Sequence, residues 1–175
     1  MVEQVKYTLL KKIDTVELRH YPKIILASAP NQINDSGFSY LFQYISGNNR
    51  SQKKIPMTAP VITQEKIPMT APVITKDGYM AFVLPQTYTK ETIPQPLSPN
   101  VTIEVIPERD LAVLRFSGVA RQKLVDEKTN DFIKILEKHQ IQTKGTIFLM
   151  RYNSPFSPGF LRRNEIAIEI TLSKD

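Results

Sequence analysis

Apolar and polar residues alternate along the first part of the chain. The alternation is clearest at residues 16–19, and an aliphatic run at 24–26 follows Pro22. A spacing of two residues is typical of strands with one buried face, and β-branched residues favour strands in general. Residues 5–30 are therefore predicted to form strands.

The spacing becomes helical in the segment from Asp35 to Gly47. Its large apolar residues fall at i, i+3, i+4 and i+7, which places them on one face of a helix. These residues are Phe38, Leu41, Phe42 and Ile45. Asp35 or Ser36 is suited to cap the start of this helix, and Gly47 is suited to end it. Tyr40 and Tyr44 form a second aromatic row beside the same face.

A second helix is predicted from about Ala120 to His139, because apolar residues repeat there on one side and charged residues fill the other. The apolar positions are Leu124, Val125, Phe132, Ile133 and Leu136. Further strands are predicted at about residues 79–84, 101–106, 111–116, 146–152 and 165–172. Residues 85–100 contain four prolines and little periodicity, which indicates a surface loop or a joint between two halves.

The two halves of the chain share one order of elements: strand, strand, helix, strand, strand. This order predicts an α+β fold with a pseudo-twofold repeat, in which antiparallel strands curl against two helices. A chain of 175 residues is long enough for one domain and short for two. We therefore expect a single domain over residues 1–175.

The sequence KIPMTAPVIT occurs twice, at residues 54–63 and 66–75. Each copy contains two prolines, which lack the amide hydrogen and clash with a preceding helical turn, so both copies are predicted to be extended. The short polar link between them favours a hairpin or a pair of edge strands. Two roles remain open for the repeat: packing one edge of the domain, or direct contact with a ligand.

The composition excludes several kinds of chemistry. The chain has no cysteine, which removes disulfides, thiolate metal sites, thiolate haem ligation and cysteine nucleophiles. The net charge of +6 favours anionic partners, but the basic residues form scattered pairs without a long basic stripe, so specific nucleic-acid binding is not expected. The N-terminus lacks the apolar core of a signal peptide, and no apolar run approaches the ~20 residues of a membrane span. A soluble, cytoplasmic and monomeric protein is expected.

The residues that usually carry catalysis are scarce. The chain contains two histidines, His20 and His139, and no glycine-rich phosphate loop, nucleophile elbow or histidine pair at metal-binding spacing. His139 falls near the end of the second helix, where the helix dipole favours a cation. His20 has the strand parity of Val16 and Leu18, so it faces either the interior or a pocket. No nucleophile and base pair can be named, which favours a binding protein over an enzyme.

The segment NSPFSPGFLRRNE, residues 153–165, combines aromatic and cationic side chains. Phe156, Phe160 and Leu161 supply apolar surface beside Arg162 and Arg163. Aromatic rings stack on planar ligands and arginine pairs with carboxylates, so the segment suits a flat apolar ligand that carries acid groups. The alternative is that the aromatic residues cover the end of the sheet while the arginines are solvated.

Several of these segments together resemble the SOUL haem-binding protein family. The resemblance is carried by GFSYLFQYISGNN leading into KIPMTAPV, by YMAFVLP after the tandem, and by NSPFSPGFLRRNEIAIEI near the end. It spans about residues 16–172. It implies a twisted antiparallel sheet or distorted barrel flanked by two helices, in the superfold shared with gyrase-inhibitor-like ligand-binding domains.

The resemblance implies binding of haem or a related tetrapyrrole in an apolar groove between the first helix and the late loop. The residues expected to line the groove are Phe38, Leu41, Phe42, Ile45, Phe156, Phe160 and Leu161, if the core does not consume the helix face. The residues expected to meet the propionates are Lys53, Lys54, Arg162 and Arg163. Family members often have a bulkier residue at the position of Gly159, so this chain lacks an aromatic platform there.

The iron ligand is not implied by the resemblance, because the family shares no single invariant one. Met57 and Met69 are thioethers able to ligate iron, although residues in so apolar a repeat favour core packing. Haem binding is therefore expected to be weak or labile and dominated by burial of the macrocycle.

Two other functions compete with haem binding. One is a gyrase-inhibitor-like binder of hydrophobic cations, whose pocket would use Tyr40, Tyr44 and a carboxylate of Glu104 or Glu165. The other is an interaction protein that docks through the apolar helix face or the tandem repeat.

Overall fold

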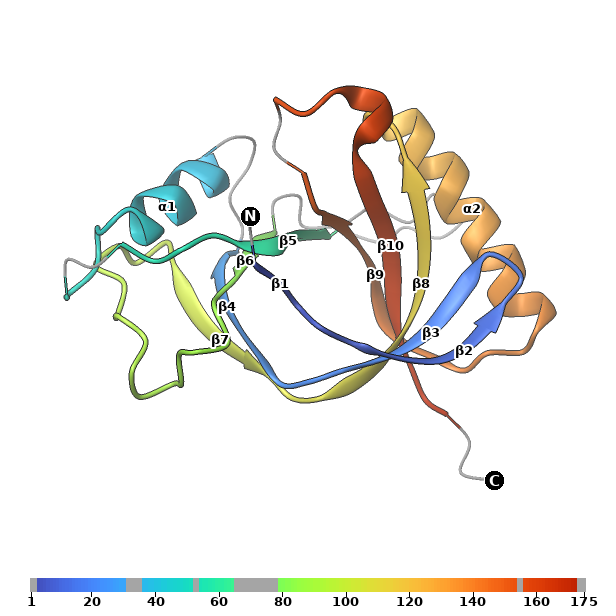
Figure 1. Cartoon of the computed structure of the whole chain (residues 1–175), viewed down its shortest axis with the longest axis horizontal. Coiled ribbons are helices and arrows are strands. Elements are labelled where there is room, and N and C mark those ends of the chain that lie inside the picture. Colours follow the sequence, from blue (N-terminus) through green and yellow to red (C-terminus); the bar gives the residue numbers. More distant parts are fainter. Residues whose placement is uncertain (1–2, 31–35, 52–53, 65–78, 154–155, 173–175) are drawn as a thin grey trace. The chain divides into compact units, whose positions relative to one another are not determined.

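The computed structural model describes residues 3–30, 36–51, 54–64, 79–153 and 156–172 (Figure 1). They form two compact units. The described residues of the first unit fall within 3–5, 23–64 and 79–107, and those of the second within 6–22 and 108–172. In the described part of the chain, each unit consists of one sheet with one α-helix packed on it.

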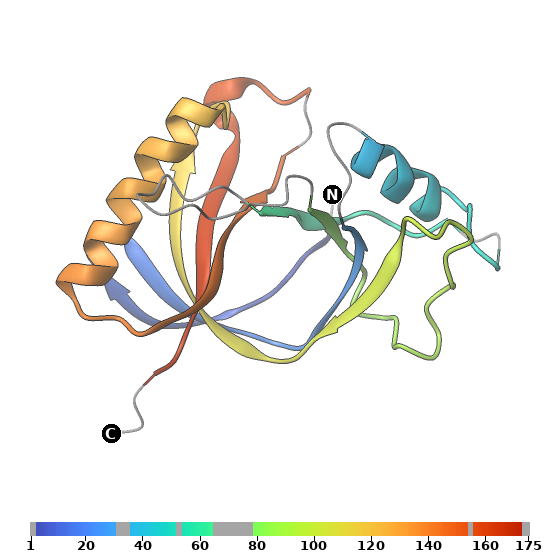
Figure 2. The same cartoon turned by 180° about the vertical axis from the view of Figure 1, so that it is seen from behind.

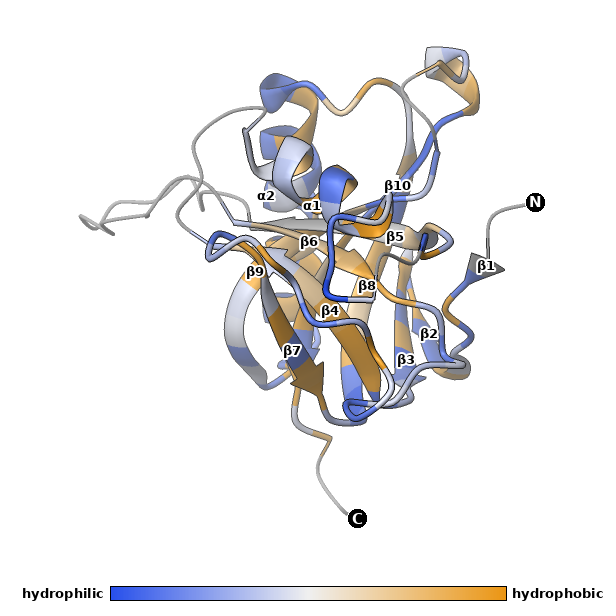
Figure 3. Ribbon diagram, turned by 90° about the vertical axis from the view of Figure 1, so that its left-hand side faces the viewer, coloured by the Kyte–Doolittle hydropathy of each residue, from blue (hydrophilic) through white to orange (hydrophobic). Residues whose placement is uncertain are grey.

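The first unit is built around the buried strand β4 (Ile24–Ala29). β4 pairs antiparallel with β6 (Met80–Val83) on one side and with β7 (Thr102–Ile106) on the other. β6 also pairs antiparallel with β5 (Thr58–Gln64), and the two-residue β1 (Glu3–Gln4) adds a parallel pair to β5. All six residues of β4 are buried, in keeping with its largely hydrophobic colouring in Figure 3.

Helix α1 (Ser36–Ile45) packs on β4 and β6, as the helical spacing predicted. The helix ends where the sequence indicated. Gly47 adopts a φ of 115°, a conformation that side chains other than glycine disfavour. This turn lets the amide of Asn48 donate to the carbonyl of Gln43 at 3.0 Å, which satisfies one of the last helix carbonyls. Of the two predicted caps for the start, Asp35 lies outside the described residues.

The second unit is a five-stranded antiparallel sheet. Its strands are β2 (Thr8–Ile13), β3 (Val16–Tyr21), β8 (Arg109–Ser117), β9 (Thr143–Arg151) and β10 (Arg163–Ile170). Their order in the sheet is β2-β3-β8-β10-β9. A single 3₁₀ turn, η1 (Gly159–Leu161), immediately precedes β10.

Helix α2 (Gln122–Lys138) covers one face of this sheet (Figures 1 and 2). It contacts β8 and β10 through buried residues spaced four, three and four apart, which is the period of one helix face. These residues are Val125, Thr129, Phe132 and Leu136. Val125, Phe132 and Leu136, together with buried residues of β3, β8, β9 and β10, form the hydrophobic core of the second unit.

The two sheets have the same internal order, and this confirms the predicted repeat. In the first unit the order is β5-β6-β4-β7, with α1 between β4 and β5 along the chain; in the second it is β9-β10-β8-β3, with α2 between β8 and β9. Along the chain, β3 directly precedes β4 but pairs with β8 of the second unit, and β7 directly precedes β8 but pairs with β4 of the first unit. In the described residues each sheet is open. The single domain predicted over 1–175 stays a prediction.

The first copy of the tandem repeat is extended, as its prolines predicted, and supplies β5. The second copy, and with it the predicted hairpin, lies outside the described residues. Residues 85–100 form turns without a strand or helix, apart from an isolated bridge between Asn49 and Pro96. Neither helix in the described ranges has the length and apolar character needed to cross a membrane.

Candidate ligand-binding surfaces

Helix α1 presents two apolar faces with different environments. Leu41 is 0% exposed and Ile45 is also buried, so both belong to the core of the first unit. Phe38 and Phe42 are 39% and 50% exposed. Their rings are stacked, with centroids 5.9 Å apart and planes 14° apart, and Phe82 meets Phe38 edge-on at 5.5 Å. The predicted binding face therefore divides into a buried half and an exposed, flat aromatic half.

The second aromatic row of α1 faces the interior. Tyr44 is buried, and its hydroxyl donates to the carbonyl of Pro94 at 2.6 Å. Burial raises the pKa of Tyr44 well above its usual range. Tyr40 is half-buried and packs against the same core. Tyr44 therefore holds the 85–100 segment in place and presents no open ring to a ligand.

The late loop exposes its apolar residues. Phe156 is 96% exposed, and Phe160 and Leu161 are also exposed, so these side chains do not cover the end of the sheet as one interpretation of the sequence had it. Gly159 lies against Val119: a Cβ at position 159 would fall 2.7 Å from Val119 Cγ2. A bulkier residue at position 159 would require Val119 to shift.

Arg162 and Arg163 point into different environments, because adjacent residues entering a strand face opposite ways. The Arg162 Nε donates to the carbonyl of Ser157 at 2.9 Å. Arg163 donates twice to Glu165 Oε1, from Nε at 3.0 Å and Nη2 at 2.7 Å, and its guanidinium lies 4.1 Å from the centre of the Tyr152 ring. The charge of Arg163 is thus balanced inside the protein. Of the two lysines expected beside these arginines, Lys54 is exposed and Lys53 lies outside the described residues.

Glu165 is the centre of a buried polar network in the second unit. It is 0% exposed and accepts two hydrogen bonds from Arg19, which is 1% exposed, at 2.8 and 3.1 Å. Arg19 also donates to the Tyr21 hydroxyl at 3.0 Å and to Glu17 at 2.8 Å. The guanidinium of Arg19 lies 4.0 Å from the centre of the Tyr7 ring. Every charged member of this network has an opposite charge within hydrogen-bonding distance.

The pKa of Glu165 reflects these partners. Burial by itself would raise the pKa of the carboxyl, but the hydrogen bonds and charge of Arg19, with those of Arg163, outweigh it and hold the pKa below its usual value. Glu165 is therefore ionised and already compensated by two guanidinium groups. Glu104, in the first unit, instead accepts hydrogen bonds from two neutral groups, the Ser28 hydroxyl at 2.6 Å and the Tyr79 hydroxyl at 3.1 Å.

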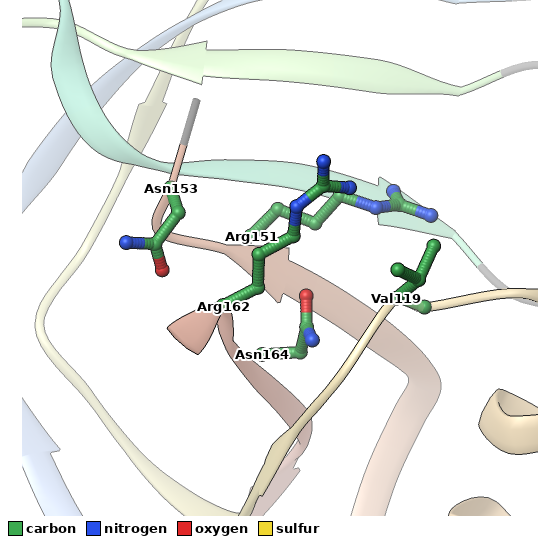
Figure 4. Close-up of a pocket in the computed structure, with 6 residues that line it drawn as sticks. Val119, Arg151, Asn153, Arg162 and Asn164 are labelled. Atoms are coloured by element: carbon green, nitrogen blue, oxygen red, sulfur yellow. The ribbon is translucent and has the colours of Figure 1, made fainter. Parts of the chain in front are cut away.

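A cavity of about 220 Å³ lies at one end of the second unit. Its lining comes from the β8–α2 connection, the end of β9, and the segment from η1 into β10 (Figure 4). The lining residues are Val119, Ala120, Arg151, Asn153, Arg162 and Asn164. Sequence reasoning singled out Arg162 and missed Arg151, Asn153 and Asn164. A signal was present for Arg151, because it is the first charged residue after the apolar run 147–150 in a predicted strand.

Neither histidine is placed as an obvious iron ligand. His20 Nδ1 lies 2.8 Å from Asp110 Oδ1, and His139 Nε2 lies 3.0 Å from Asp14 Oδ2, so each imidazole is hydrogen-bonded to a carboxylate. Met57 packs against the core of the first unit, and Met69 lies outside the described residues. No group of three or more histidine or acidic side chains suited to a metal ion occurs among the residues that the structure describes. The described residues thus include exposed apolar and cationic side chains on both units, and no axial iron ligand is assigned among them.

Comparison with known proteins gives a family and a fold. The family model of the SOUL heme-binding protein matches residues 2–169. No curated protein matches the chain. The C-terminal domain of EcmrR is similar in structure, with a TM-score of 0.58, 13% identity, and 94% of this chain and 98% of that chain covered.

Two proteins of Listeria innocua are also similar in structure. One is an uncharacterized conserved protein, with a TM-score of 0.62, 8% identity, and 90% of this chain and 92% of that chain covered. The other is a hydrolase, with a TM-score of 0.59, 8% identity, and coverage of 92% and 94%. At these identities, the likeness shows a shared fold alone.

Proposed function

Because the chain belongs to the SOUL heme-binding protein family, we propose that it binds haem or a related tetrapyrrole and catalyses no reaction on it. The observation that carries the proposal is the stacked pair of exposed rings on α1, Phe38 and Phe42. A planar macrocycle gains most from flat apolar surfaces, and two rings within 14° of parallel present one.

The aromatic pair is fixed before a ligand arrives. Phe38 is held edge-on by Phe82, which is itself buried in the core, and α1 is anchored beneath the pair by Leu41. A surface that is already ordered loses little side-chain entropy on binding. The favourable free energy of binding then comes from removing apolar ring surface from water, at about 25 cal/mol per Å². Without an assigned iron ligand, we expect this burial to dominate, and binding to be weak or labile.

The late loop offers a second apolar surface of the same kind in the other unit, with Phe160 and Leu161 exposed and Arg162 beside them. A groove that uses both surfaces at once is the prediction made from the sequence, and it stays a prediction. It has a direct test. If one hemin molecule contacts both surfaces, Phe42→Ala and Phe160→Ala should each lower the hemin affinity. If hemin contacts one surface alone, only the variant on that surface should lower the affinity.

The cation-binding alternative is less well supported. Of the carboxylates proposed for it, Glu165 is already paired with two arginines, and a lipophilic cation would have to displace one of them from a buried site. Of the tyrosines, Tyr44 is buried and hydrogen-bonded to Pro94. Glu104 is the carboxylate with neutral partners, so this alternative would depend on Glu104.

We expect Phe42→Ala to weaken hemin binding about 5- to 30-fold, because loss of one stacked ring removes about 1–2 kcal/mol of aromatic contact. Hemin titration followed at the Soret band measures the change. The matched control is Leu97→Ala, which truncates another exposed apolar residue of the first unit that is not part of the Phe38–Phe42 pair, and it should leave the affinity unchanged. Equal affinities for the wild type and Phe42→Ala would remove α1 from the binding site.

A further inference from the structure

The second unit has an exposed apolar surface at the end where β8 leads into α2. Val119, Phe160 and Leu161 are 41%, 77% and 62% exposed, and we call these three residues the η1 surface. Val119 lies in the connection from β8 to α2, and the other two belong to η1. Phe156, earlier in the same loop, is 96% exposed. Apolar side chains this exposed gain free energy when an apolar medium covers them.

The η1 surface is one patch, although Val119 is far from η1 in the sequence. A Cβ at Gly159 would fall 2.7 Å from Val119 Cγ2, so the backbone of η1 runs directly against the Val119 side chain. The amide of Gly118 donates to the carbonyl of Arg162 at 3.3 Å, and the Asn164 side chain donates to the carbonyl of Gly118 at 2.9 Å. Figures 1 and 2 both show η1 beside the start of α2. The patch is therefore held in place on the end of the sheet.

Basic residues accompany the η1 surface. The two segments that carry it, residues 117–125 and 153–164, contain four basic residues and no acidic one. Two of the four, Arg121 and Lys123, are exposed. Helix α2 begins in the first of these segments, with no acidic residue in its first turn and no side-chain hydrogen bond at its cap. The positive end of its dipole therefore adds to the positive charge at this end of the unit.

The acidic residues that border the two segments leave an excess of positive charge. Glu165 is buried and accepts hydrogen bonds from Arg19 and Arg163. Asp126 lies one turn into α2 and accepts a hydrogen bond from the Gln122 side chain at 2.7 Å. With both acids counted, four basic residues stand against two acidic ones, which is a net charge of +2. The η1 surface is therefore suited to an anionic partner.

The combination of projecting apolar side chains and neighbouring cations matches the boundary of a membrane with anionic headgroups. A protein partner needs a pocket shaped to receive the projecting side chains, whereas fluid acyl chains do not. We propose that the η1 surface attaches this chain to an anionic lipid surface. Phe160 and Leu161 enter the boundary of the acyl region, and Arg121 and Lys123 stay at the headgroups. This attachment does not depend on tetrapyrrole binding.

The test uses the full-length chain without hemin, and phosphatidylcholine vesicles with or without about a quarter phosphatidylserine. We expect the wild type to sediment with the anionic vesicles and to stay in solution with the neutral ones. Raising the salt from about 0.1 M to about 0.5 M should weaken binding, because salt screens exposed charges. Phe160→Ala should weaken binding about 10-fold through loss of inserted apolar area, and Arg121→Gln about 5-fold through loss of one cation at the headgroups.

Each variant has a matched control in the same unit. Leu9→Ala truncates an apolar side chain of β2 that is 53% exposed, and Lys134→Gln removes an exposed cation further along α2. Both controls should bind the vesicles as the wild type does. Equal losses in Lys134→Gln and Arg121→Gln would show that net charge alone attracts the chain. Equal losses in Leu9→Ala and Phe160→Ala would show that the η1 surface has no special part. Either result would overturn the proposal.

A tryptophan reporter tests whether the η1 surface itself enters the lipid. The chain has no tryptophan, so Phe160→Trp places a single indole at the η1 surface and Leu9→Trp places one elsewhere in the unit. With anionic vesicles, emission of Phe160→Trp should shift to shorter wavelength and be quenched by brominated acyl chains, while emission of Leu9→Trp should not change. Emission of Phe160→Trp that ignores the vesicles, or equal binding to neutral vesicles, would overturn the proposal. Because hemin is absent, either result leaves the proposed function to its own titration.

Discussion

Glu165→Gln is expected to lower the free energy of unfolding by about 3–5 kcal/mol. The substitution keeps the shape of the side chain and removes its charge, which leaves the guanidinium of Arg19 buried without its main counter-ion. Urea unfolding measures the change, with an unchanged m-value as the sign that the unfolded state is unaffected.

The matched control lies on the same strand. Glu169 makes long, partly exposed ion pairs with Arg109 at 3.7 Å and Lys144 at 3.6 Å, so Glu169→Gln should cost less than about 1 kcal/mol. If the two variants lose similar amounts of unfolding free energy, the buried Arg19–Glu165 pair contributes no more to stability than a partly exposed ion pair.

The network also predicts a pH dependence. The pKa of Glu165 is lower in the folded chain than the ~4.3 of an unfolded glutamate, so the folded state binds fewer protons at this site. The resulting stability is fully present above about pH 4.3 and is lost as pH falls through the folded-state pKa. The difference in unfolding free energy between wild type and Glu165→Gln should therefore narrow as the solution is acidified below pH 4.3.

Leu41→Ala is expected to lower the free energy of unfolding by about 2–5 kcal/mol, because Leu41 is 0% exposed and its removal leaves a cavity beneath α1. Its neighbour Phe42 is half exposed, so Phe42→Ala should cost less than about 1 kcal/mol of stability. The two variants should separate in function as well. While it is folded, Leu41→Ala should keep its hemin affinity, whereas Phe42→Ala should bind hemin more weakly. Urea unfolding and Soret titration of both variants check this pair of expectations. A large loss of hemin affinity in folded Leu41→Ala would place Leu41 in contact with the ligand.

The helices could be predicted from the sequence because burial on one face imposes a period of 3.6 residues, and α1 and α2 lie within two residues of the predicted bounds. The repeated order of elements was also visible. The pairing of β3 with β8 and of β7 with β4 could not be predicted, because strand pairing between distant segments leaves no local pattern in the sequence.

The candidate site was predictable only in part. Phe38 and Phe42 share the helical face of Leu41, and spacing alone does not show that the core uses one side of that face. The different roles of Arg162 and Arg163 follow from strand alternation, but the partner of Arg163 does not. The burial of Arg19 depends on Glu165, 146 residues away in the sequence. Arg151 and Asn164 lie side by side because β10 begins next to the end of β9, where the two residues are paired in the sheet.

Tetrapyrrole binding is best tested by titration of hemin into the purified wild-type chain. We expect a saturable shift of the Soret band with one hemin per chain, reduced in Phe42→Ala and unchanged in Leu97→Ala. A spectrum that follows hemin in buffer, or in the presence of an unrelated protein, at every ratio would contradict the claim that this chain binds tetrapyrroles.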